Sequence, residues 1–404
     1  MKRNFDAVIL GGGASGLMCA ITAKQHNPQI KIAIIEKNDR VGKKLLSTGN
    51  GRCNLTNAKV SADRYTGSFG TKTGSILKRY DTQRILDCFA DLGLQAAPDS
   101  EGRYYPLCRQ ASAVVDVLRF ACERSGVEVF CGENVKSLKK QGERFCVTSH
   151  ENTFTARKLI IACGSKAAPK LGGSASAADY LKNLGHTVVP FSPALCPVKV
   201  DSGVLKALKG IRTAAAVTLT RGGTAIHSER GEVQFTENAL SGICVFNLSL
   251  YTRPGDSITI DLCNDISDKE LYSLLQQHQK LFAALPCDNL LTGIFHKRLA
   301  QAVMKSAGVQ GFSRPCSDLT EDELRVIAHT AKHFTFTVKE NSGFEQAQCA
   351  KGGVKGDEID ERTMQSKKCR ILYVCGEAID ICGECGGYNL HFAFATGCIA
   401  GESL

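Results

Sequence analysis

The chain has 404 residues, enough for about two or three domains, and its 43% hydrophobic and 22% charged residues fit a soluble globular protein with a large core. No apolar run reaches membrane-spanning length. The first residues have the pattern of an apolar strand and not that of a signal peptide. We therefore expect a cytoplasmic protein with no membrane contact.

The formal net charge is +10, but the basic residues are scattered apart from pairs such as Lys43-Lys44 and Lys139-Lys140. A scattered excess favours a solvated surface over a nucleic-acid site, and it leaves anionic partners open. Nineteen cysteines are many, and in the cytoplasm we expect most to be reduced thiols in the core. Their spacing with histidine does not indicate zinc, so no metal site is expected.

The first stretch of the chain has the pattern of a nucleotide-binding βαβ unit. An apolar strand, Phe5–Leu10, runs into Gly11, Gly13 and Gly16, and a helical pattern follows. These glycines allow a tight turn, the approach of a pyrophosphate and close helix–strand packing. A second strand ends at Glu36, 20 residues after Gly16, where a carboxylate accepts hydrogen bonds from a ribose. The pattern predicts a dinucleotide with a free 2′-hydroxyl and leaves FAD and NAD open.

Residues 37–57 are rich in glycine, hydroxyl, amide and basic side chains, and predict a long ordered loop that contacts the cofactor. Apolar periodicity predicts helices over 76–96 and 111–125 and a short helix over 174–184. Strands are expected at 127–130, 143–149 and 158–164, the last ending in a small-residue turn at Ala162, Cys163 and Gly164 that abuts the cofactor.

The pattern changes near the two prolines of 189–193, which mark a domain boundary. Alternating segments over 194–262 and 333–339 predict an antiparallel β domain, and 267–330 has helical spacing with Asp268 and Thr320 as N-caps. We expect domains at 1–190, 191–345 with a helical subdomain at about 265–330, and 346–404.

The last segment returns to α/β character. It has a turn at Lys351–Val354, a buried strand at 371–375, Gly376–Asp380, and a glycine-led apolar helix over 386–401. Asp380 is placed to hold ribityl hydroxyls, and the N-terminus of that helix is placed to face the pyrimidine end of a flavin. A helix that simply packs on the sheet explains this segment equally well.

Several motifs together resemble one family. Among them are Gly42-Lys-Lys-Leu-Leu46, Gly49-Asn-Gly-Arg-Cys-Asn-Leu-Thr-Asn57, Lys351-Gly-Gly-Val354, Thr363-Met-Gln-Ser-Lys367 and Gly386-Gly-Tyr-Asn-Leu390. They resemble the BaiN/YhiN-type family of FAD flavoproteins, also called aminoacetone-oxidase-like or NAD(P)/FAD-dependent oxidoreductases. The resemblance implies an α/β fold: a Rossmann-like FAD domain with an inserted antiparallel, barrel-like β domain and a small helical subdomain.

The resemblance also implies tight, non-covalent FAD, held by both ends of the chain. The residues expected to bind it are Gly11, Gly12, Gly13, Ala14, Ser15, Gly16, Glu36, Lys37, Lys44, Leu45, Gly49, Gly51, Arg52, Cys53, Asn54, Val135, Ala162, Cys163, Gly164, Gly376, Glu377, Asp380, Gly387, Asn389 and Leu390. With one nucleotide fingerprint in the chain, NAD(P)H is expected to bind transiently as electron donor. The implied reaction is reduction of an activated C=C bond in a small organic substrate, including steroid-type ones.

Two other activities stay open: a flavin amine oxidase that releases peroxide, and an RNA-modifying flavoprotein, which the scattered charge and the lack of tryptophan disfavour. The family's usual Phe-Thr-His and Gly-Leu-Ser-Gly-Pro motif is altered here, with Glu237 and Ile243 at its histidine and proline positions. Its Gly-Ser-Thr-Gly-Asp-Gly-Tyr stretch is reduced to 173–180. These departures weaken any inference about the substrate.

Catalytic candidates are Arg52, Tyr388 and His391, with Arg103 and Tyr105 as further substrate-side candidates. Arg52 suits an anionic substrate or reduced flavin, or it holds its loop by bonding backbone carbonyls. His391 is either an acid/base or a packed core histidine.

Cys382-Gly-Glu-Cys385 is the single C-x-x-C of the chain, and it is either a dithiol relay or a coincidental pair among many cysteines. The sequence leaves the oligomeric state open.

Overall fold

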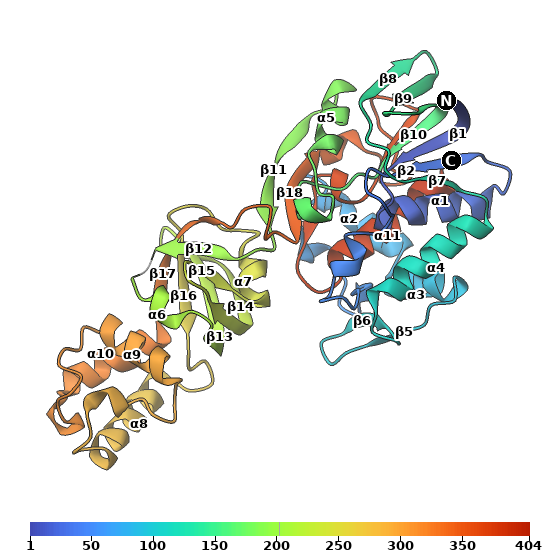
Figure 1. Ribbon diagram of the computed structural model, residues 1–404. Coiled ribbons are helices and arrows are strands. Elements are labelled where there is room, and N and C mark those ends of the chain that lie inside the picture. The colour runs from blue at the N-terminus through green and yellow to red at the C-terminus, as the bar shows by residue number, and fades with distance from the viewer. Residues whose placement is uncertain (202) are drawn as a thin grey trace. The chain divides into compact units, whose positions relative to one another are not determined.

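The computed structural model describes residues 1–201 and 203–404, and these form two compact units (Figure 1). Unit 1 combines Met1–Ala194 with Phe344–Leu404, and unit 2 is Leu195–Gly343. Both ends of the chain thus belong to one unit, with the other inserted between them. The boundaries expected near residues 190 and 345 lie within a few residues of this division.

Unit 1 is built on a mixed sheet whose central strands are parallel. In sheet order its strands are β7 (Glu128–Phe130), β2 (Ile32–Ile35), β1 (Lys2–Leu10), β10 (Thr153–Ile161), β9 (Arg144–Thr148) and β8 (Ser137–Gln141), and β19 (Leu372–Val374) also pairs with β10. The strands β7, β2, β1, β10 and β19 pair in parallel, whereas β9 and β8 are antiparallel. This arrangement confirms the Rossmann-like expectation.

The helices of unit 1 pack against its sheets and against one another. They are α1 (Ala14–His26), α2 (Gly70–Arg79), α3 (Thr82–Asp91), α4 (Ala111–Arg124), α5 (Ser176–Asn183) and α11 (Tyr388–Glu402). Helices α1 and α11 pack closely together, because a side chain at Gly397 would lie 2.5 Å from the Ser15 carbonyl oxygen. Gly401 approaches the Cys19 carbonyl in the same way. Since α11 is buried along nearly its whole length, the two ends of the chain share one core.

The helix expected over 76–96 is two helices in the structure. Helix α2 ends at Arg79, and α3 begins at Thr82. Asp81 causes the break, because its carboxylate accepts a hydrogen bond of 2.8 Å from the Arg84 amide and so caps α3. The apolar stripe continues across the break, since Ile76, Ile85 and Phe89 are all buried. The stripe alone therefore does not reveal the cap.

Three small sheets complete unit 1. They are β3 (Thr56–Asn57) with β6 (Arg103–Pro106) and β5 (Ala96–Pro98), β4 (Tyr65–Thr66) with β20 (Cys382–Gly383), and β11 (Val188–Ala194) with β18 (Cys349–Val354). The prediction of a turn at 351–354 is wrong, because these residues are part of β18. Gly352 and Gly353 are needed there because each has a positive φ and lies against a backbone carbonyl, of Pro190 and Ala378 respectively.

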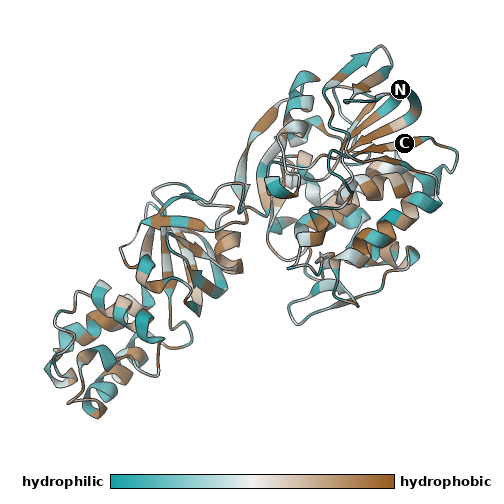
Figure 2. Cartoon of the chain, viewed as in Figure 1, coloured by the Kyte–Doolittle hydropathy of each residue, from teal (hydrophilic) through white to brown (hydrophobic). Residues whose placement is uncertain are grey.

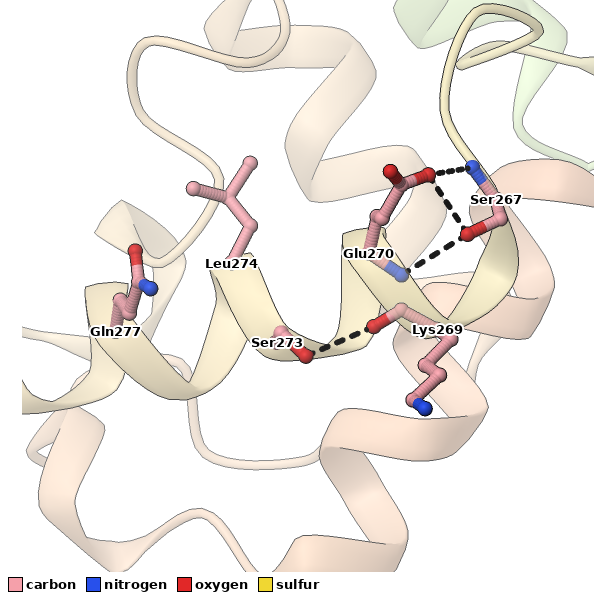
Figure 3. A pocket seen from close by; sticks show the side chains of 6 residues that line it. All are labelled: Ser267, Lys269, Glu270, Ser273, Leu274 and Gln277. Atoms are coloured by element: carbon pink, nitrogen blue, oxygen red, sulfur yellow. Dashed lines mark hydrogen bonds between the residues drawn. The ribbon is translucent and has the colours of Figure 1, made fainter.

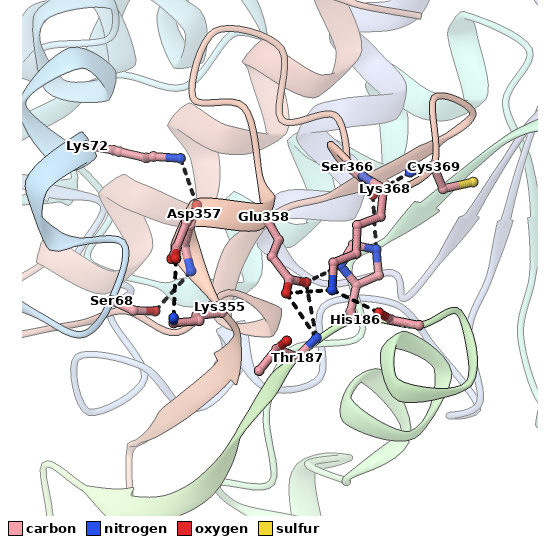
Figure 4. Close-up of polar contacts among 12 residues, drawn as sticks. Ser68, Lys72, His186, Thr187, Lys355, Asp357, Glu358, Ser366, Lys368 and Cys369 are labelled. Atoms are coloured by element: carbon pink, nitrogen blue, oxygen red, sulfur yellow. Dashed lines mark hydrogen bonds and ion pairs between the residues drawn. The ribbon is translucent and has the colours of Figure 1, made fainter.

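A partly buried ionic network joins the start of β11 to residues 355–369 (Figure 4). The Glu358 carboxylate accepts hydrogen bonds from His186 Nδ1 at 2.8 Å and the Thr187 amide at 3.1 Å, and it pairs with Lys368 at 2.7 Å. Burial opposes ionisation of Glu358, but these donors outweigh it and lower its pKa to about 2. Glu358 is therefore ionised, and its contacts hold the start of β11 to residues 355–369 within unit 1.

Unit 2 contains a closed antiparallel barrel. Its strands, in order round the barrel, are β12 (Val198–Asp201), β15 (Ala239–Ser241), β14 (Thr224–Phe235), β13 (Arg212–Arg221), β16 (Ser257–Asp261) and β17 (Phe334–Asn341). Val217, Phe235 and Ile258 are among the fully buried residues that fill it. The barrel confirms the expected antiparallel β fold.

The helices of unit 2 are α6 (Leu205–Leu208), α7 (Ile243–Leu248), α8 (Asp268–Leu281), α9 (Lys297–Ser306) and α10 (Glu321–Lys332). Thr320 caps α10 as expected, but α8 is capped by Ser267 and not by Asp268. Figure 3 shows the reason: Ser267 Oγ accepts from the Glu270 amide at 3.2 Å, and the Glu270 carboxylate accepts from the Ser267 amide at 2.7 Å. The shallow hollow around these residues is the polar surface of one helix.

Short 3₁₀ helices lie between the longer elements of the described residues: η1 (Leu45–Ser47), η2 (Ala62–Arg64), η3 (Pro169–Leu171), η4 (Cys287–Asn289), η5 (Cys316–Asp318), η6 (Gly356–Glu358) and η7 (Gly376–Ala378). Apolar residues line the central strands of the unit 1 sheet (Figure 2). Among the described helices, none combines the length and the apolar character needed to cross a bilayer.

Candidate functional site

The candidate site lies at one edge of the parallel sheet. Strands β2, β1, β10 and β19 end side by side there, since Leu10 pairs with Ile35 and Ile161, and Ile161 pairs with Val374. The segments that follow these strands are Gly11–Gly16, Glu36, Ala162–Gly164 and Gly376–Asp380. The fold therefore brings these four predicted segments to the carboxyl edge, where parallel α/β sheets bind their ligands.

Three glycines of the first turn serve different purposes. Gly11 has φ +108°, and a Cβ there would lie 2.5 Å from the Ala162 carbonyl oxygen. A Cβ on Gly16 would collide with the Gly11 carbonyl oxygen, so both glycines are required for folding. Gly13 is different: its φ of −90° and ψ of −165° suit any residue, and a Cβ would meet no atom within 4 Å.

The open space at Gly13 lies at the N-terminus of α1, whose cap residue is Gly13 itself. The first amides of a helix have no partner within the helix and carry its positive dipole end. An unobstructed backbone at this position suits the approach of a pyrophosphate. The folded protein does not need a glycine at residue 13, which agrees with the predicted phosphate contact there.

Glu36 is buried and held at the end of β2. One oxygen accepts a hydrogen bond from the Gly12 amide at 2.8 Å, and the other accepts from the amide and side chain of Asn38 at 2.8 and 2.7 Å. A carboxylate has about four acceptor positions, so Oε2 can still accept from a ribose hydroxyl. Asn38, which fixes the carboxylate, was not predicted, because an asparagine two residues after an acid has no distinctive pattern.

The loop at 49–54 has an unusual backbone. Gly49, Asn50, Gly51 and Cys53 all have positive φ, of 56°, 55°, 78° and 58°. For Asn50 and Cys53 this conformation costs about 1–3 kcal/mol each, and such strain concentrates at functional sites. Burial raises the pKa of Cys53 to about 12, so this cysteine is a neutral thiol that packs the loop.

Two buried acceptors in this region lack a partner. Lys44 Nζ forms an ion pair of 2.7 Å with Oε2 of Glu377, which joins the loop before residue 49 to η7. The other oxygen, Glu377 Oε1, and Asn54 Oδ1 are buried with no hydrogen-bond partner among the described residues. Buried acceptors are nearly always satisfied, so each requires a donor that the protein does not supply. Hydroxyl and ring N–H groups of a flavin nucleotide are donors of the required kind.

Asp380 and Asn389 are engaged within the protein. Asp380 accepts from the Ser68 amide at 2.9 Å and the Gly352 amide at 3.0 Å. Asn389 bonds both backbone groups of Gly383 at 2.8 Å. These contacts hold the backbone before α11 in place, and contact of the two side chains with a ribityl chain stays a prediction.

His391 is fully buried on α11, with both ring nitrogens occupied. Its Nε2 donates to the Tyr80 carbonyl at 2.9 Å, so Nδ1 is the acceptor for the Thr56 hydroxyl at 2.7 Å. Burial lowers the pKa of His391 to about 4. This geometry favours a neutral histidine that ties β3 and α2 to α11, and its catalytic role remains an untested prediction.

The remaining substrate-side candidates all have contacts within the protein. The Arg52 guanidinium lies 4.8 Å from the ring centre of Tyr105 and donates to the Gly49 carbonyl at 3.0 Å. This supports a loop-holding role for Arg52 while leaving its other nitrogens for a ligand. Tyr388 is buried edge-on against Tyr65, and Arg103 pairs with Asp99 at 2.8 Å.

The other predicted cofactor residues surround the same edge. Leu45 is buried, Leu390 and Val135 are half-buried, and Lys37 is exposed just after Glu36. Cys163 donates to the Leu10 carbonyl at 3.2 Å, and burial raises its pKa to about 12. Ala14, Ser15, Gly164 and Gly387 lie at the two helix starts and the β10 turn.

The Cys382 thiol is buried, and it hydrogen-bonds the thiol of Cys349. That bond and burial raise the pKa of Cys349 well above its usual range. All 19 cysteines among the described residues are free thiols. Since thiolates, and not buried thiols, exchange disulfides, the geometry favours a coincidental C-x-x-C pair.

Together, the strand edge, the open Gly13 and the unsatisfied acceptors define a dinucleotide-binding α/β protein, and these acceptors fit the hydroxyl and N–H donors of FAD. The family model described as "HI0933-like protein Rossmann domain" matches residues 5–403, and the chain belongs to this family. It is an FAD-dependent oxidoreductase, and the BaiN/YhiN-type resemblance read from the sequence is confirmed.

Curated relatives match along the whole chain. The 3-dehydro-bile acid delta(4,6)-reductase of Clostridium scindens is 34% identical over 403 residues, covering 98% of each chain. The ribosomal RNA dihydrouridine synthase of Escherichia coli is 27% identical over 408 residues, covering 100% of this chain and 98% of its own. Relatives of this one family thus have names that refer to two different substrates.

A solved structure agrees with the fold. The 3-ketosteroid-delta4-(5alpha)-dehydrogenase of Rhodococcus jostii, in complex with 4-androstene-3,17-dione, has a TM-score of 0.51 at 13% identity. The match covers 99% of this chain and 96% of that one. At this identity the likeness shows the fold alone.

Proposed function

We propose that this protein is a reductase that uses NAD(P)H and FAD to reduce a C=C bond conjugated to a carbonyl in a small organic substrate. The observation that carries the proposal is its 34% identity, over 98% of both chains, to a 3-dehydro-bile acid delta(4,6)-reductase. The site supports it, because the strand edge has an open phosphate cradle at Gly13 and unsatisfied acceptors at Asn54 and Glu377.

Bound FAD supplies a ring that accepts a hydride from NAD(P)H and gives it to the substrate. In the net reaction, the hydride adds to the β-carbon of the conjugated bond, a proton adds to the α-carbon, and NAD(P)H leaves as NAD(P)⁺. The protein's part is to position the partners, exclude water and stabilise charge. The positive N-terminus of α11, which starts at Tyr388, is available to stabilise negative charge on a reduced ring.

Other residues of the chain hold the cofactor in this proposal. The first amides of α1 bind the pyrophosphate, and Glu36 Oε2 accepts from the ribose. Glu377 Oε1 and Asn54 Oδ1 accept from hydroxyl or N–H groups of the flavin half. The Lys44–Glu377 ion pair keeps the second acceptor turned to the ligand, because it fixes one oxygen of the carboxylate.

A second candidate is reduction of uridine in ribosomal RNA. It is favoured by 27% identity over the whole chain to a ribosomal RNA dihydrouridine synthase. The chemistry is related, because the C5=C6 bond of uracil is also conjugated to a carbonyl. Unit 2 has nearly as many acidic as basic residues, so it carries little of the net positive charge that RNA-binding domains usually have. We therefore rank the small-molecule substrate first.

The test is an anaerobic experiment in two steps. Mixing the holoprotein with NADH or NADPH bleaches the flavin absorbance if either is the donor. The reduced protein is then mixed with a steroid 4-en-3-one, its saturated 3-ketone as a matched control, and ribosomal RNA that lacks dihydrouridine. We expect reoxidation by the enone and not by the saturated ketone.

Reoxidation by the RNA alone would replace the first candidate with the second. A flavin that NAD(P)H does not bleach, but that an amine reduces with release of peroxide in air, would show an amine oxidase instead.

A further inference from the structure

Two histidines and an aspartate come together on the surface of unit 2. His329 lies in the last turn of α10, His333 is the residue that ends this helix, and Asp268 is the first residue of α8. One ligand atom from each of these side chains lies within 4.8 Å of the others. Helices α8 and α10 pack against each other, so residues 61 positions apart or more meet at one point.

From this cluster we propose that Asp268, His329 and His333 form a site for a divalent zinc ion that links α8 to α10. Imidazole nitrogen and carboxylate oxygen are common zinc ligands, and three protein ligands plus water complete a tetrahedral site. Zinc–ligand distances of about 2.0–2.2 Å place ligand atoms about 3.3 Å apart in that geometry. The exposed side chains can reach this separation by rotamer changes that shorten the distances between their ligand atoms by about 1.5 Å or less.

The spacing of the histidines is the first argument for the site. Residues four apart lie on the same face of a helix, one turn above the other. The two rings are stacked, with centres 4.1 Å apart and planes 21° from parallel. Rotation of these exposed rings about their side-chain torsions can turn one nitrogen of each toward a single metal ion.

The second argument is a hydrogen bond that prepares a ligand atom. His333 Nδ1 lies 3.1 Å from the His329 carbonyl oxygen. A carbonyl only accepts, so Nδ1 carries the hydrogen and the lone pair of the neutral ring is on Nε2. Metal-binding histidines typically have this arrangement, with one nitrogen donating to a carbonyl or carboxylate and the other free for the metal.

Local charge also favours a cation. The C-terminus of α10 carries the negative end of its dipole, and Asp268 adds a carboxylate. Lys332, which directly precedes His333, is already paired with Asp261 at 2.9 Å and donates to the Cys263 and Ile266 carbonyls. All three proposed ligands are exposed, so ion binding requires little desolvation of the side chains.

The absence of zinc spacing in the sequence does not bear on this site. That expectation considered cysteine–histidine clusters close in sequence, whereas the third ligand here comes from a different helix. The pair His329-Thr-Ala-Lys-His333 is visible in the sequence, but only the packing of α8 on α10 supplies Asp268.

Cobalt(II) is a useful probe for the test, because thiolate ligands give it a strong charge-transfer band that nitrogen and oxygen ligands do not. The holoprotein is titrated with Co²⁺ under reducing conditions, and Zn²⁺ affinity is measured by calorimetry. The variants are His329→Ala, His333→Ala and Asp268→Asn, with the exposed His150→Ala as matched control. Circular dichroism confirms that each variant is folded.

We expect one Co²⁺ signal without a thiolate band, and a Zn²⁺ affinity that falls at least about tenfold in both histidine variants and is unchanged in His150→Ala. Zn²⁺ should raise the Tm of the natural chain by at least about 2 °C and leave that of His333→Ala unchanged.

A metal signal that persists in both histidine variants, or that carries the thiolate band, overturns the proposal. So does a loss of Tm in His333→Ala that is the same with and without Zn²⁺, because that result shows only a role at the helix end.

Discussion

Replacing Gly13 with alanine tests the cofactor site directly, because the structure separates the demands of folding from those of the ligand. The Gly13 backbone is extended and a Cβ would meet no atom within 4 Å, so Gly13→Ala should change the stability of the apoprotein by only about 0.5 kcal/mol. The added methyl group occupies space that the pyrophosphate needs. FAD affinity should therefore fall.

The size of the effect follows from the hydrogen bonds that are lost. A bond between a backbone amide and a charged group contributes about 1.5–3 kcal/mol, so losing one phosphate contact weakens FAD binding about 10- to 150-fold. Gly16→Ala is the contrasting variant, since its methyl group collides with the Gly11 carbonyl and should destabilise the fold itself. Gly74→Ala, at an open and exposed position of α2, is the matched control.

The assay uses apoprotein from which flavin has been removed. FAD titration by quenching of flavin fluorescence gives Kd, and thermal unfolding of the apoprotein gives Tm. We expect Gly13→Ala to lose affinity at nearly constant Tm, and Gly74→Ala to keep its affinity. Equal FAD affinity in Gly13→Ala and the natural chain would refute the reasoning, as would a Tm of apo Gly13→Ala lowered as far as that of Gly16→Ala.

Three further predictions concern stability and the thiols. Glu358 has a folded pKa of about 2, below the unfolded value near 4.5, so its contribution, on the order of 1–3 kcal/mol after solvent screening, is present above pH 4.5 and lost as pH falls toward 2. Glu358→Gln should remove that acid-dependent loss in urea unfolding between pH 5 and 3, and an unchanged slope would contradict it. His391 has a folded pKa of about 4, below the unfolded value of about 6.5, so the stability that it contributes above pH 6.5 is lost as pH falls from about 6.5 to 4. The free energy of unfolding of His391→Asn should therefore depend less on pH over this range. A pH dependence as steep as in the natural chain would count against the neutral, buried histidine. Thiol titration of the denatured protein should give 19 thiols both with and without prior reduction, and Cys382→Ser should keep its turnover; a lower count before reduction, together with lost turnover, would revive the dithiol relay.

The strand edge could be predicted from the sequence because its pattern is local. An apolar strand, spaced glycines and a terminal acid specify a βαβ unit, and parallel strands necessarily end at a common edge. The link between the two ends of the chain followed from the motif after β19, and the structure places that motif beside β10 and α1.

Features that depend on packing could not be predicted from the sequence. Asp81 splits a predicted helix because its side chain caps α3, although the apolar stripe runs on through the break. Ser267 and not Asp268 caps α8, because the choice depends on which residue leaves the helical backbone conformation. The sequence also does not show that Asp380 already bonds two backbone amides, since both donors come from distant segments.

The central claim is that this family member takes electrons from NAD(P)H and gives them to a conjugated C=C bond. The most direct measurement is a single turnover without oxygen, in which the NAD(P)H-reduced holoprotein is mixed with a steroid 4-en-3-one and the product is identified by mass spectrometry. We predict one saturated product per flavin, formed at the rate at which the flavin reoxidises. A flavin that stays reduced in the presence of enones, or an enone recovered unchanged, would contradict it.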